Sequence, residues 1–281
     1  MQLVARALID GTPCPGEIAG DRFHVIDGDI LGEHQRRGHS VPALEAVLLA
    51  PLAGVRFINV MGGFKMPGGL GADLPPMWLP KANNYPSGDG AEIPIPAILT
   101  GPVVIESELA VVVGQPLRKA SADEARRAIF GWTVFNDITA QEYGPMGFWA
   151  VGKSIDGFAS WGPWIRRDLT EERVLDGLAI SSTVNGIQVQ SGNTKLFKFP
   201  PSEMLSHISH RITLFPGDVV ALGTPPPPAE VTAGDHTVCS VEEVGALNNH
   251  FVEDSVVSHG QAPTRSSSSL ARSTDRRTDD R

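Results

Sequence analysis

Two glutamates separated by one residue, Glu106 and Glu108, open an apolar run that extends to Val113. Side chains of a strand repeat every two residues, so both carboxylates would lie on one face, roughly 6–7 Å apart along the strand. Two buried carboxylates repel each other and lose their hydration unless a proton or a cation neutralises them. The pattern therefore favours a cation site. Alternatively, the strand emerges into solvent here and the pair is only a polar edge.

A third acidic residue, Asp137, follows Asn136 at the end of a second apolar run, residues 131–135. An Asn-Asp pair after a strand is typical of a turn. Taken together with the two glutamates, however, Asp137 would supply a third hard oxygen donor. A set of carboxylates alone favours Mg²⁺, Mn²⁺ or Ca²⁺ over zinc, with water or substrate completing the coordination.

Two further residues could act on a substrate at such a site. Lys153 lies in a Gly-Lys-Ser sequence among small and apolar residues. A single lysine is usually solvated, but beside an oxyanion it could stabilise charge or carry a proton. Thr224, in a Leu-Gly-Thr-Pro sequence after an apolar run, could offer its hydroxyl and neighbouring amides to an anionic ligand. A plain turn is the alternative for this segment.

Strands are the main elements expected to position these residues. Apolar runs predict strands at residues 55–61, 103–113, 132–135, 180–184, 187–190, 219–222 and 236–241. Asn185-Gly186 predicts a type I′ hairpin turn. Helices are expected at residues 41–50, from a capping box at Ser121 toward Phe130, and from Ser202 as the cap through Ile208. Strands outnumber helices without a regular βαβ alternation, which indicates an α+β, mainly β fold.

The chain divides into three predicted regions. Residues 1–70 form a small N-terminal subdomain, residues 71–253 a catalytic domain, and residues 254–281 a disordered tail that is rich in Ser, Arg and Asp and poor in apolar residues. Residues 62–100 are dense in Gly and Pro, which excludes a helix or a central strand and predicts a long ordered loop or lid.

Composition narrows the classes of function. The chain has 281 residues, 41% of them hydrophobic, and a net charge of −9, so nucleic acid is not an expected partner. No apolar run suits a membrane helix and no signal peptide opens the chain, so no membrane association and a cytoplasmic location are expected. The two cysteines, Cys14 and Cys239, lie far apart and indicate neither a disulfide framework nor a zinc knuckle.

Seven short blocks occur in an order and spacing that resemble the fumarylacetoacetate hydrolase (FAH) family. The blocks are Glu106–Gly114, Asn136–Ala140, Gly152–Ser154, Gly162–Trp164, Val184–Gly186, Pro216–Asp218 and Gly223–Pro225. The resemblance runs from about residue 76 to residue 252. It implies a mixed β-roll or sandwich, usually dimeric, that binds one Mg²⁺, Mn²⁺ or Ca²⁺ per chain and a small-molecule substrate. By position, the metal ligands are Glu106, Glu108 and Asp137, and Lys153 and Thr224 are catalytic residues that contact the substrate.

The chain departs from this family at three places around the implied substrate. Where family hydrolases have a His/Glu pair that activates water, residues 59–68 contain neither histidine nor glutamate. Where the family has an Arg and a Gln that grip the substrate carboxylate, this chain has Gln141, the expected substrate-binding residue, and Gly144. Three prolines, 226–228, replace the glycine that usually follows Gly-Thr-Pro. The substrate, or the reaction, should therefore differ from that of ordinary family hydrolases.

The resemblance implies a divalent-metal-dependent enzyme that acts on a 1,3-dicarbonyl or keto-acid substrate through a metal-chelated enolate. Hydrolysis of a C–C bond is the default reaction because it is the usual one of the family. A non-hydrolytic lyase or isomerase, such as a decarboxylase, tautomerase or dehydratase, is the alternative that suits the missing His/Glu pair. A non-catalytic binding protein that keeps the fold is the third reading.

Overall fold

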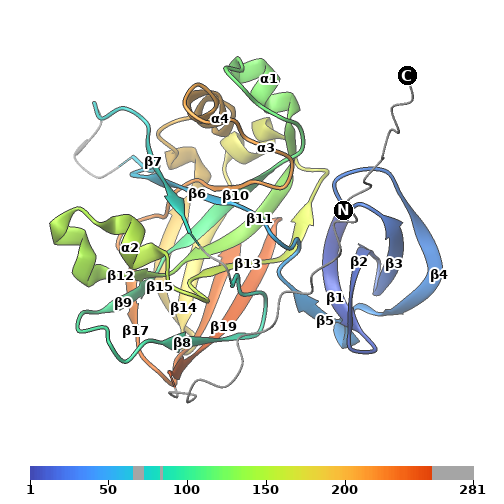
Figure 1. Cartoon of the computed structure of the whole chain (residues 1–281), viewed down its shortest axis with the longest axis horizontal. Helices are drawn as coiled ribbons and strands as arrows, with labels where there is room; N and C mark the ends of the chain where they lie inside the picture. The colour runs from blue at the N-terminus through green and yellow to red at the C-terminus, as the bar shows by residue number, and fades with distance from the viewer. Residues whose placement is uncertain (66–72, 83–84, 255–281) are drawn as a thin grey trace, which may run out of the picture.

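A computed structural model describes residues 1–65, 73–82 and 85–254 (Figure 1). The predicted disordered tail lies outside the described residues except for Asp254. Within them, most elements are strands, which confirms the α+β, mainly β fold class. No helix among these residues is long and apolar enough to cross a membrane. Both cysteines are free thiols, as expected.

An eleven-stranded sheet forms the body of the described chain. Its strands, in spatial order, are β4 (His34–Pro42), β3 (Arg22–Gly28), β2 (Thr12–Ala19), β1 (Leu3–Ile9), β13 (Ala159–Arg166), β11 (Ile129–Asp137), β10 (Ser107–Val113), β16 (Val219–Ala221), β6 (Phe57–Met61) and β7 (Met77–Lys81), with β5 (Val47–Leu49) paired to β1. The N-terminal strands β1–β5 form a curled lobe at the right of Figure 1. Pairing of β1 with β13 makes this lobe continuous with the core sheet. The domain boundary predicted at residue 70 stays a prediction.

Two smaller sheets complete the core. One has the order β12 (Thr139–Ala140), β9 (Val103–Ile105) and β17 (Ala229–Val231). The other has the order β15 (Ile187–Asn193), β14 (Ala179–Val184), β18 (His236–Val241), β19 (Gly245–Glu253) and β8 (Ala91–Ile95). The predicted Asn-Gly hairpin joins β14 to β15, and the φ angles of 52° at Asn185 and 80° at Gly186 confirm the turn type.

The helices are short. They are α1 (Ala122–Arg127), α2 (Trp149–Lys153), α3 (Glu171–Asp176) and α4 (Pro201–Ser209), with 3₁₀ turns η1 (Ala43–Glu45), η3 (Gln141–Met146) and η4 (Thr194–Leu196). Figure 1 shows α1, α3 and α4 together at one end of the sheet and α2 beside β12. The capping box predicted at Ser121 is present at the start of α1.

The central strand β10 is apolar at almost every position because both of its faces are buried. Leu109, Val111 and Val113 belong to one core cluster, which includes Trp132, Leu205 and Leu222. Ala110 and Val112 belong to a second cluster on the opposite face, which includes Phe57, Phe135 and Trp161. Glu108 alternates with the first set, so it lies on the face of Ala110 and Val112.

Four expectations about elements are wrong. The helix expected at residues 41–50 is instead the end of β4, the turn η1 and strand β5, because pairing of β5 with β1 outweighs the helical propensity of this segment. Residues 62–100 are not only loop, since they contain β7 and β8. Both are edge strands, where Pro80 and Pro94 are tolerated.

The other two errors concern a long strand and a helix cap. The strand expected over 103–113 is interrupted at Glu106, where the chain passes from the sheet of β9 to the sheet of β10. Ser202 does not cap α4, which begins with Pro200 as its N-cap. Instead, the Ser202 N–H donates to the buried carboxylate of Glu171, at 2.6 Å, so an acid from α3 caps this helix.

Candidate metal centre

Three carboxylates meet where the main sheet passes into the sheet of β9. Glu106 lies at the junction of β9 and β10, Glu108 lies within β10, and Asp137 ends the neighbouring strand β11. The Asp137 N–H donates to the Glu106 carbonyl at 3.0 Å, which fixes the alignment of the two strands. One oxygen from each of the three carboxylates lies within 4.8 Å of the others. The structure thus brings together the three residues expected as metal ligands.

Lys153 lies among these carboxylates rather than in solvent. Its ammonium nitrogen is 2.5 Å from Glu106 Oε2 and 2.8 Å from Thr139 Oγ1, and it also pairs with Asp137. Gly152 allows this placement, since a Cβ there would lie 2.3 Å from the Ala140 carbonyl oxygen. The glycine of the Gly-Lys-Ser block therefore lets α2 approach β12 closely enough for the lysine to reach the site.

Lys81 is a second buried lysine, and no sequence pattern singles it out. It ends β7, and its side chain is 0% exposed. Its ammonium lies 2.6 Å from Asp137 Oδ1 and donates to the carbonyls of Phe158 at 2.7 Å and Ile138 at 3.2 Å. The only signal in the sequence is the short apolar run before it, in a segment expected to be a loop.

The two lysines hold Asp137 ionised. Burial alone would raise the pKa of Asp137, but the charges of Lys153 and Lys81 outweigh burial and lower it to about 2. Burial lowers the pKa of Lys81 despite the attraction of Asp137. Burial also acts to lower the pKa of Lys153, yet the surrounding carboxylates raise it, so this lysine remains an ammonium ion.

Glu108 is the carboxylate with the least compensation. Burial, and then repulsion from Asp137 and Glu106, raises its pKa well above the ordinary value. Among the described residues its side chain accepts one hydrogen bond, from the Gly223 N–H at 2.7 Å. Burial likewise raises the pKa of Glu106, against the attraction of Lys153. A divalent cation would offset this repulsion, so the donor set fits such an ion.

Asn59 adds an unsatisfied polar group to the same face of the sheet. It lies in β6 opposite Ala221, which in turn is opposite Ala110 in β10. It is fully buried, and neither its amide nitrogen nor its amide oxygen has a hydrogen-bond partner among the described residues. Buried amides normally have hydrogen-bond partners, so the Asn59 side chain could still donate and accept hydrogen bonds at this face of the sheet.

Thr224 is fastened to the strand that carries the glutamates. Its hydroxyl donates to the Ser107 carbonyl at 3.0 Å and accepts from Gln190 Nε2 at 3.1 Å. The buried Gln190 amide also donates to the carbonyls of Pro225 and Pro227. Sequence reasoning missed Gln190, although it lies in the predicted hairpin. Thr224 lies beside the carboxylates, and its contact with substrate stays a prediction.

Gln141 and Gly144 both lie in η3, the 3₁₀ turn that follows β12. Gln141 begins η3 directly after β12, and no hydrogen bond in the described part of the chain joins its side chain to the three carboxylates. Its role as a substrate-binding residue therefore stays a prediction. At Gly144 a Cβ would lie 2.3 Å from the Trp149 ring. The indole thus occupies the space into which a longer side chain at position 144 would extend.

Comparison with known proteins assigns the family. The family of the fumarylacetoacetate (FAA) hydrolase C-terminal domain matches residues 61–252, more than half of the chain, so this chain belongs to it. Protein Rv2993c of Mycobacterium tuberculosis is 32% identical over 255 residues, which cover 89% of this chain and 94% of that protein.

Two further relatives are named for their activities. Oxaloacetate tautomerase FAHD2A of Homo sapiens is 35% identical over 161 residues, 52% of this chain. The matched region covers 50% of FAHD2A, so this chain spans about half the length of that relative. The crystal structure of a 2-hydroxyhepta-2,4-diene-1,7-dioate isomerase from Mycobacterium marinum superposes with a TM-score of 0.83 at 27% identity, covering 91% of this chain and 100% of that one. Membership in the family confirms the FAH-type fold, and the named relatives, a tautomerase and an isomerase, agree with the expectation of an enzyme.

Proposed function

We propose that this chain is a divalent-metal-dependent enzyme that converts a 1,3-dicarbonyl or keto-acid substrate through its enolate. The observation that carries the proposal is the cluster of Glu106, Glu108 and Asp137, each with one oxygen within 4.8 Å of the others; Glu108 and Asp137 are buried and Glu106 is partly exposed. Mg²⁺ is the first candidate, with Mn²⁺ or Ca²⁺ as alternatives, because all three donors are carboxylates. A cation bound there supplies Lewis-acid polarisation of carbonyl oxygens.

The side chains of this chain supply the remaining functions. Lys153 keeps its proton between two carboxylates and presents a fixed positive charge, which stabilises negative charge on an enolate oxygen. Lys81 holds the other oxygen of Asp137, so this carboxylate cannot rotate freely. The loop at Gly223 and Thr224 is clamped to β10 by Glu108, Ser107 and Gln190, which keeps one wall of the site rigid.

The reaction we favour needs no added water. In the described residues 59–65, where family hydrolases carry the water-activating pair, the side chains are apolar, glycine, an amide and Lys65. Phe64 there is buried against Phe197, with ring centroids 5.0 Å apart. A tautomerisation, isomerisation or decarboxylation requires proton movement but no attacking hydroxide. The names of two relatives, a tautomerase and an isomerase, agree with this choice.

The test is product analysis in ¹⁸O-labelled water. The full-length protein with Mg²⁺ or Mn²⁺ is incubated with oxaloacetate and with a series of 2,4-diketo acids, and loss of enol absorbance is followed in parallel with mass spectrometry. We expect conversion without label in a newly formed acid product. Labelled acid from a cleaved substrate would establish C–C hydrolysis, the default predicted from sequence, and overturn the preference stated above.

A pair of variants links turnover to the site. Lys153→Met should abolish conversion. Arg37→Met, which removes one positive charge from an exposed ion pair in β4, should leave conversion unchanged. Equal activity of the two variants would exclude the role given to Lys153. A homodimer and a cytoplasmic location remain predictions from the sequence. Sedimentation of the purified protein tests the first of these.

A further inference from the structure

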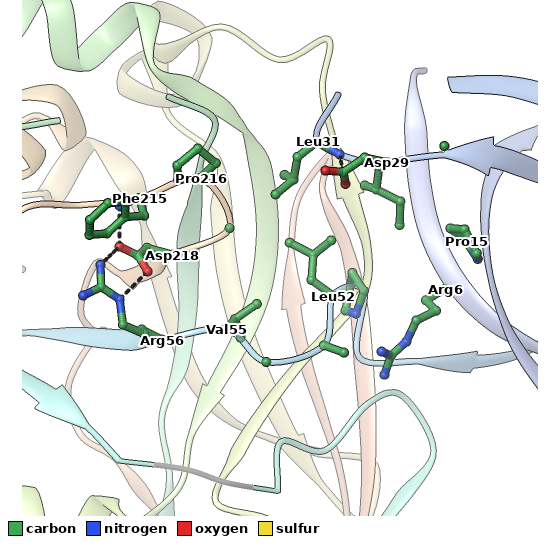
Figure 2. Close-up of a pocket in the computed structure, with 16 residues that line it drawn as sticks. Arg6, Pro15, Asp29, Leu31, Leu52, Val55, Arg56, Phe215, Pro216 and Asp218 are labelled. Carbon is green, nitrogen blue, oxygen red and sulfur yellow. Dashed lines mark hydrogen bonds and ion pairs between the residues drawn. The ribbon is translucent and has the colours of Figure 1, made fainter. Parts of the chain in front are cut away.

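A second concave site lies between the N-terminal strands and the core, apart from the three carboxylates (Figure 2). The crevice has a volume of about 710 Å³, within the range of small-molecule sites, about 300–1,000 Å³. Its walls come from residues 28–31, 51–56 and 215–218, together with Arg6 of β1 and Pro15 of β2. None of Glu106, Glu108, Asp137, Lys81 and Lys153 lines it.

The crevice and the carboxylates lie toward opposite ends of β16. Arg56 directly precedes β6 and Asp218 directly precedes β16, and both line the crevice. At the other end of β16, Gly223 donates to Glu108. A ligand in the crevice would therefore not contact the residues of the candidate metal centre.

The walls of the crevice are largely apolar. In Figure 2, Leu31 and Leu52 lie between the N-terminal strands and the core, and Val55 and Pro216 lie on the core side of the crevice. A Cβ on Gly217 would lie 3.3 Å from Leu31 Cδ1 and 3.8 Å from Leu52 Cδ1, so these side chains close against the 215–218 turn. The apolar lining suits a ligand with a hydrocarbon body.

The charges at one end of the crevice already neutralise each other. Arg56 pairs through two nitrogens with both carboxylate oxygens of Asp218, and it also donates to the Thr213 carbonyl at 3.1 Å. Asp29 lies apart from this ion pair, in the upper part of Figure 2, and its carboxylate accepts the Leu31 N–H at 3.0 Å, a bond that leaves its charge in place. Because Arg56 and Asp218 are each other's counter-ions, neither needs a ligand to balance its charge.

Arg6 differs from Arg56 in having no partner. In the part of the chain that the structure describes, no hydrogen bond or ion pair reaches its guanidinium, and its Nε is buried without an acceptor. Arg6 is only partly buried, and this burial lowers its pKa from the ordinary value, with no described counter-ion to offset the effect. Figure 2 shows the side chain extending from β1 toward the loop that holds Leu52.

We infer that this crevice binds a small organic carboxylate, with its anionic head on Arg6 and its hydrocarbon body against Leu31, Leu52 and Val55. A guanidinium and a carboxylate match in a two-point geometry, which gives a stronger contact than a single hydrogen bond. The carboxylate would supply the counter-charge that Arg6 lacks. The ligand would also join the N-terminal lobe to the core, because Arg6 belongs to the lobe and Val55 to the chain entering β6.

The probe is octanoate, with octanol as a neutral ligand of similar length. Binding to the full chain is measured by isothermal titration calorimetry in EDTA, so that a carboxylate cannot bind through a divalent cation at the other site. We expect saturable binding of octanoate and at least tenfold weaker binding of octanol. Arg6→Met should weaken octanoate at least tenfold, while Arg37→Met, on exposed strand β4, and Glu108→Gln, at the metal centre, should not.

Several results would overturn the inference. One is no saturable binding of octanoate, and another is equal binding by wild type and Arg6→Met. A loss of binding in Glu108→Gln would place the carboxylate at the metal centre instead. If Arg6→Met changes the sedimentation coefficient and leaves octanoate binding intact, the crevice is a contact between copies of this chain. Melting curves of each variant establish that it is folded.

Discussion

Replacing Lys81 by Met tests how much a buried ion pair stabilises this fold when no divalent cation is added. The Lys81 side chain is 0% exposed, and its ammonium serves one oxygen of Asp137 and two backbone carbonyls. Removing one partner of a buried pair typically costs about 3–5 kcal/mol. Lys153 still pairs with the other oxygen of Asp137, so we expect the lower end, about 3 kcal/mol.

The measurement is urea unfolding followed by tryptophan fluorescence in EDTA, with the free energy of unfolding compared between variants. Arg37→Met is the matched control, because Arg37 also lies 2.6 Å from a carboxylate oxygen, that of Asp27. The Arg37 and Asp27 side chains are 60% and 67% exposed, and exposed pairs contribute about 0–1 kcal/mol. The two variants lose the same charge and differ mainly in burial.

Three results would refute the reasoning about Lys81. Equal losses in Lys81→Met and Arg37→Met would show that burial does not decide the strength of this pair. A gain of stability in Lys81→Met would show that the free-energy cost of desolvating the ammonium exceeds the stabilisation from its three hydrogen bonds. Retained stability combined with lost activity would assign Lys81 to catalysis alone.

Two further predictions concern packing and pH. Gly152→Ala should lose about 1–3 kcal/mol of stability and most activity, because its Cβ would lie 2.3 Å from the Ala140 carbonyl oxygen. Gly38→Ala is the control and should change little, because the space around Gly38 is open. Equal losses of stability in the two variants, measured by urea unfolding, would contradict this prediction. Burial raises the pKa of Cys239 to about 12 from 9.0, so its contribution to stability is complete below pH 9 and is lost between about pH 9 and 12. Cys239→Ala should therefore lose less stability than wild type across that range, and identical alkaline unfolding curves would refute the prediction.

Much of the fold and site followed from patterns that are local in the chain. The two-residue period placed Glu106 and Glu108 together, and the Asn-Gly turn and the Ser121 capping box are properties of a few adjacent residues. These features need no knowledge of distant contacts. Asp137 and Lys153 were candidates from their own sequence context and from the family blocks, and the structure brings both to the same cluster.

The errors arose where distant parts of the chain decide the outcome. Residues 47–49 form a strand because β1 offers an edge, which no local pattern indicates. Lys81 is buried because β7 pairs with β6 and carries it toward Asp137, 56 positions later in the sequence. The cap of α4 comes from Glu171, on another helix, for the same reason. Burial of a charged side chain depends on partners that the neighbouring sequence does not contain.

The most direct test of the metal centre is the stabilisation that divalent cations give to wild type and to Glu108→Gln. Glu92→Gln, which changes an exposed acid, serves as the control. In EDTA, Glu108→Gln should be at least as stable as wild type, because burial and repulsion already penalise the Glu108 charge. A cation that binds only the folded state stabilises it by about 2.7 kcal/mol when its concentration is one hundred times its dissociation constant. Added Mg²⁺ or Mn²⁺ should therefore raise the melting temperatures of wild type and Glu92→Gln.

Glu108→Gln should show little or no rise under the same conditions, and metal analysis should find about one cation per wild-type chain, the number that one three-carboxylate site implies. An equal rise in Glu108→Gln, or no rise in wild type, would contradict the assignment of Glu106, Glu108 and Asp137 as metal ligands.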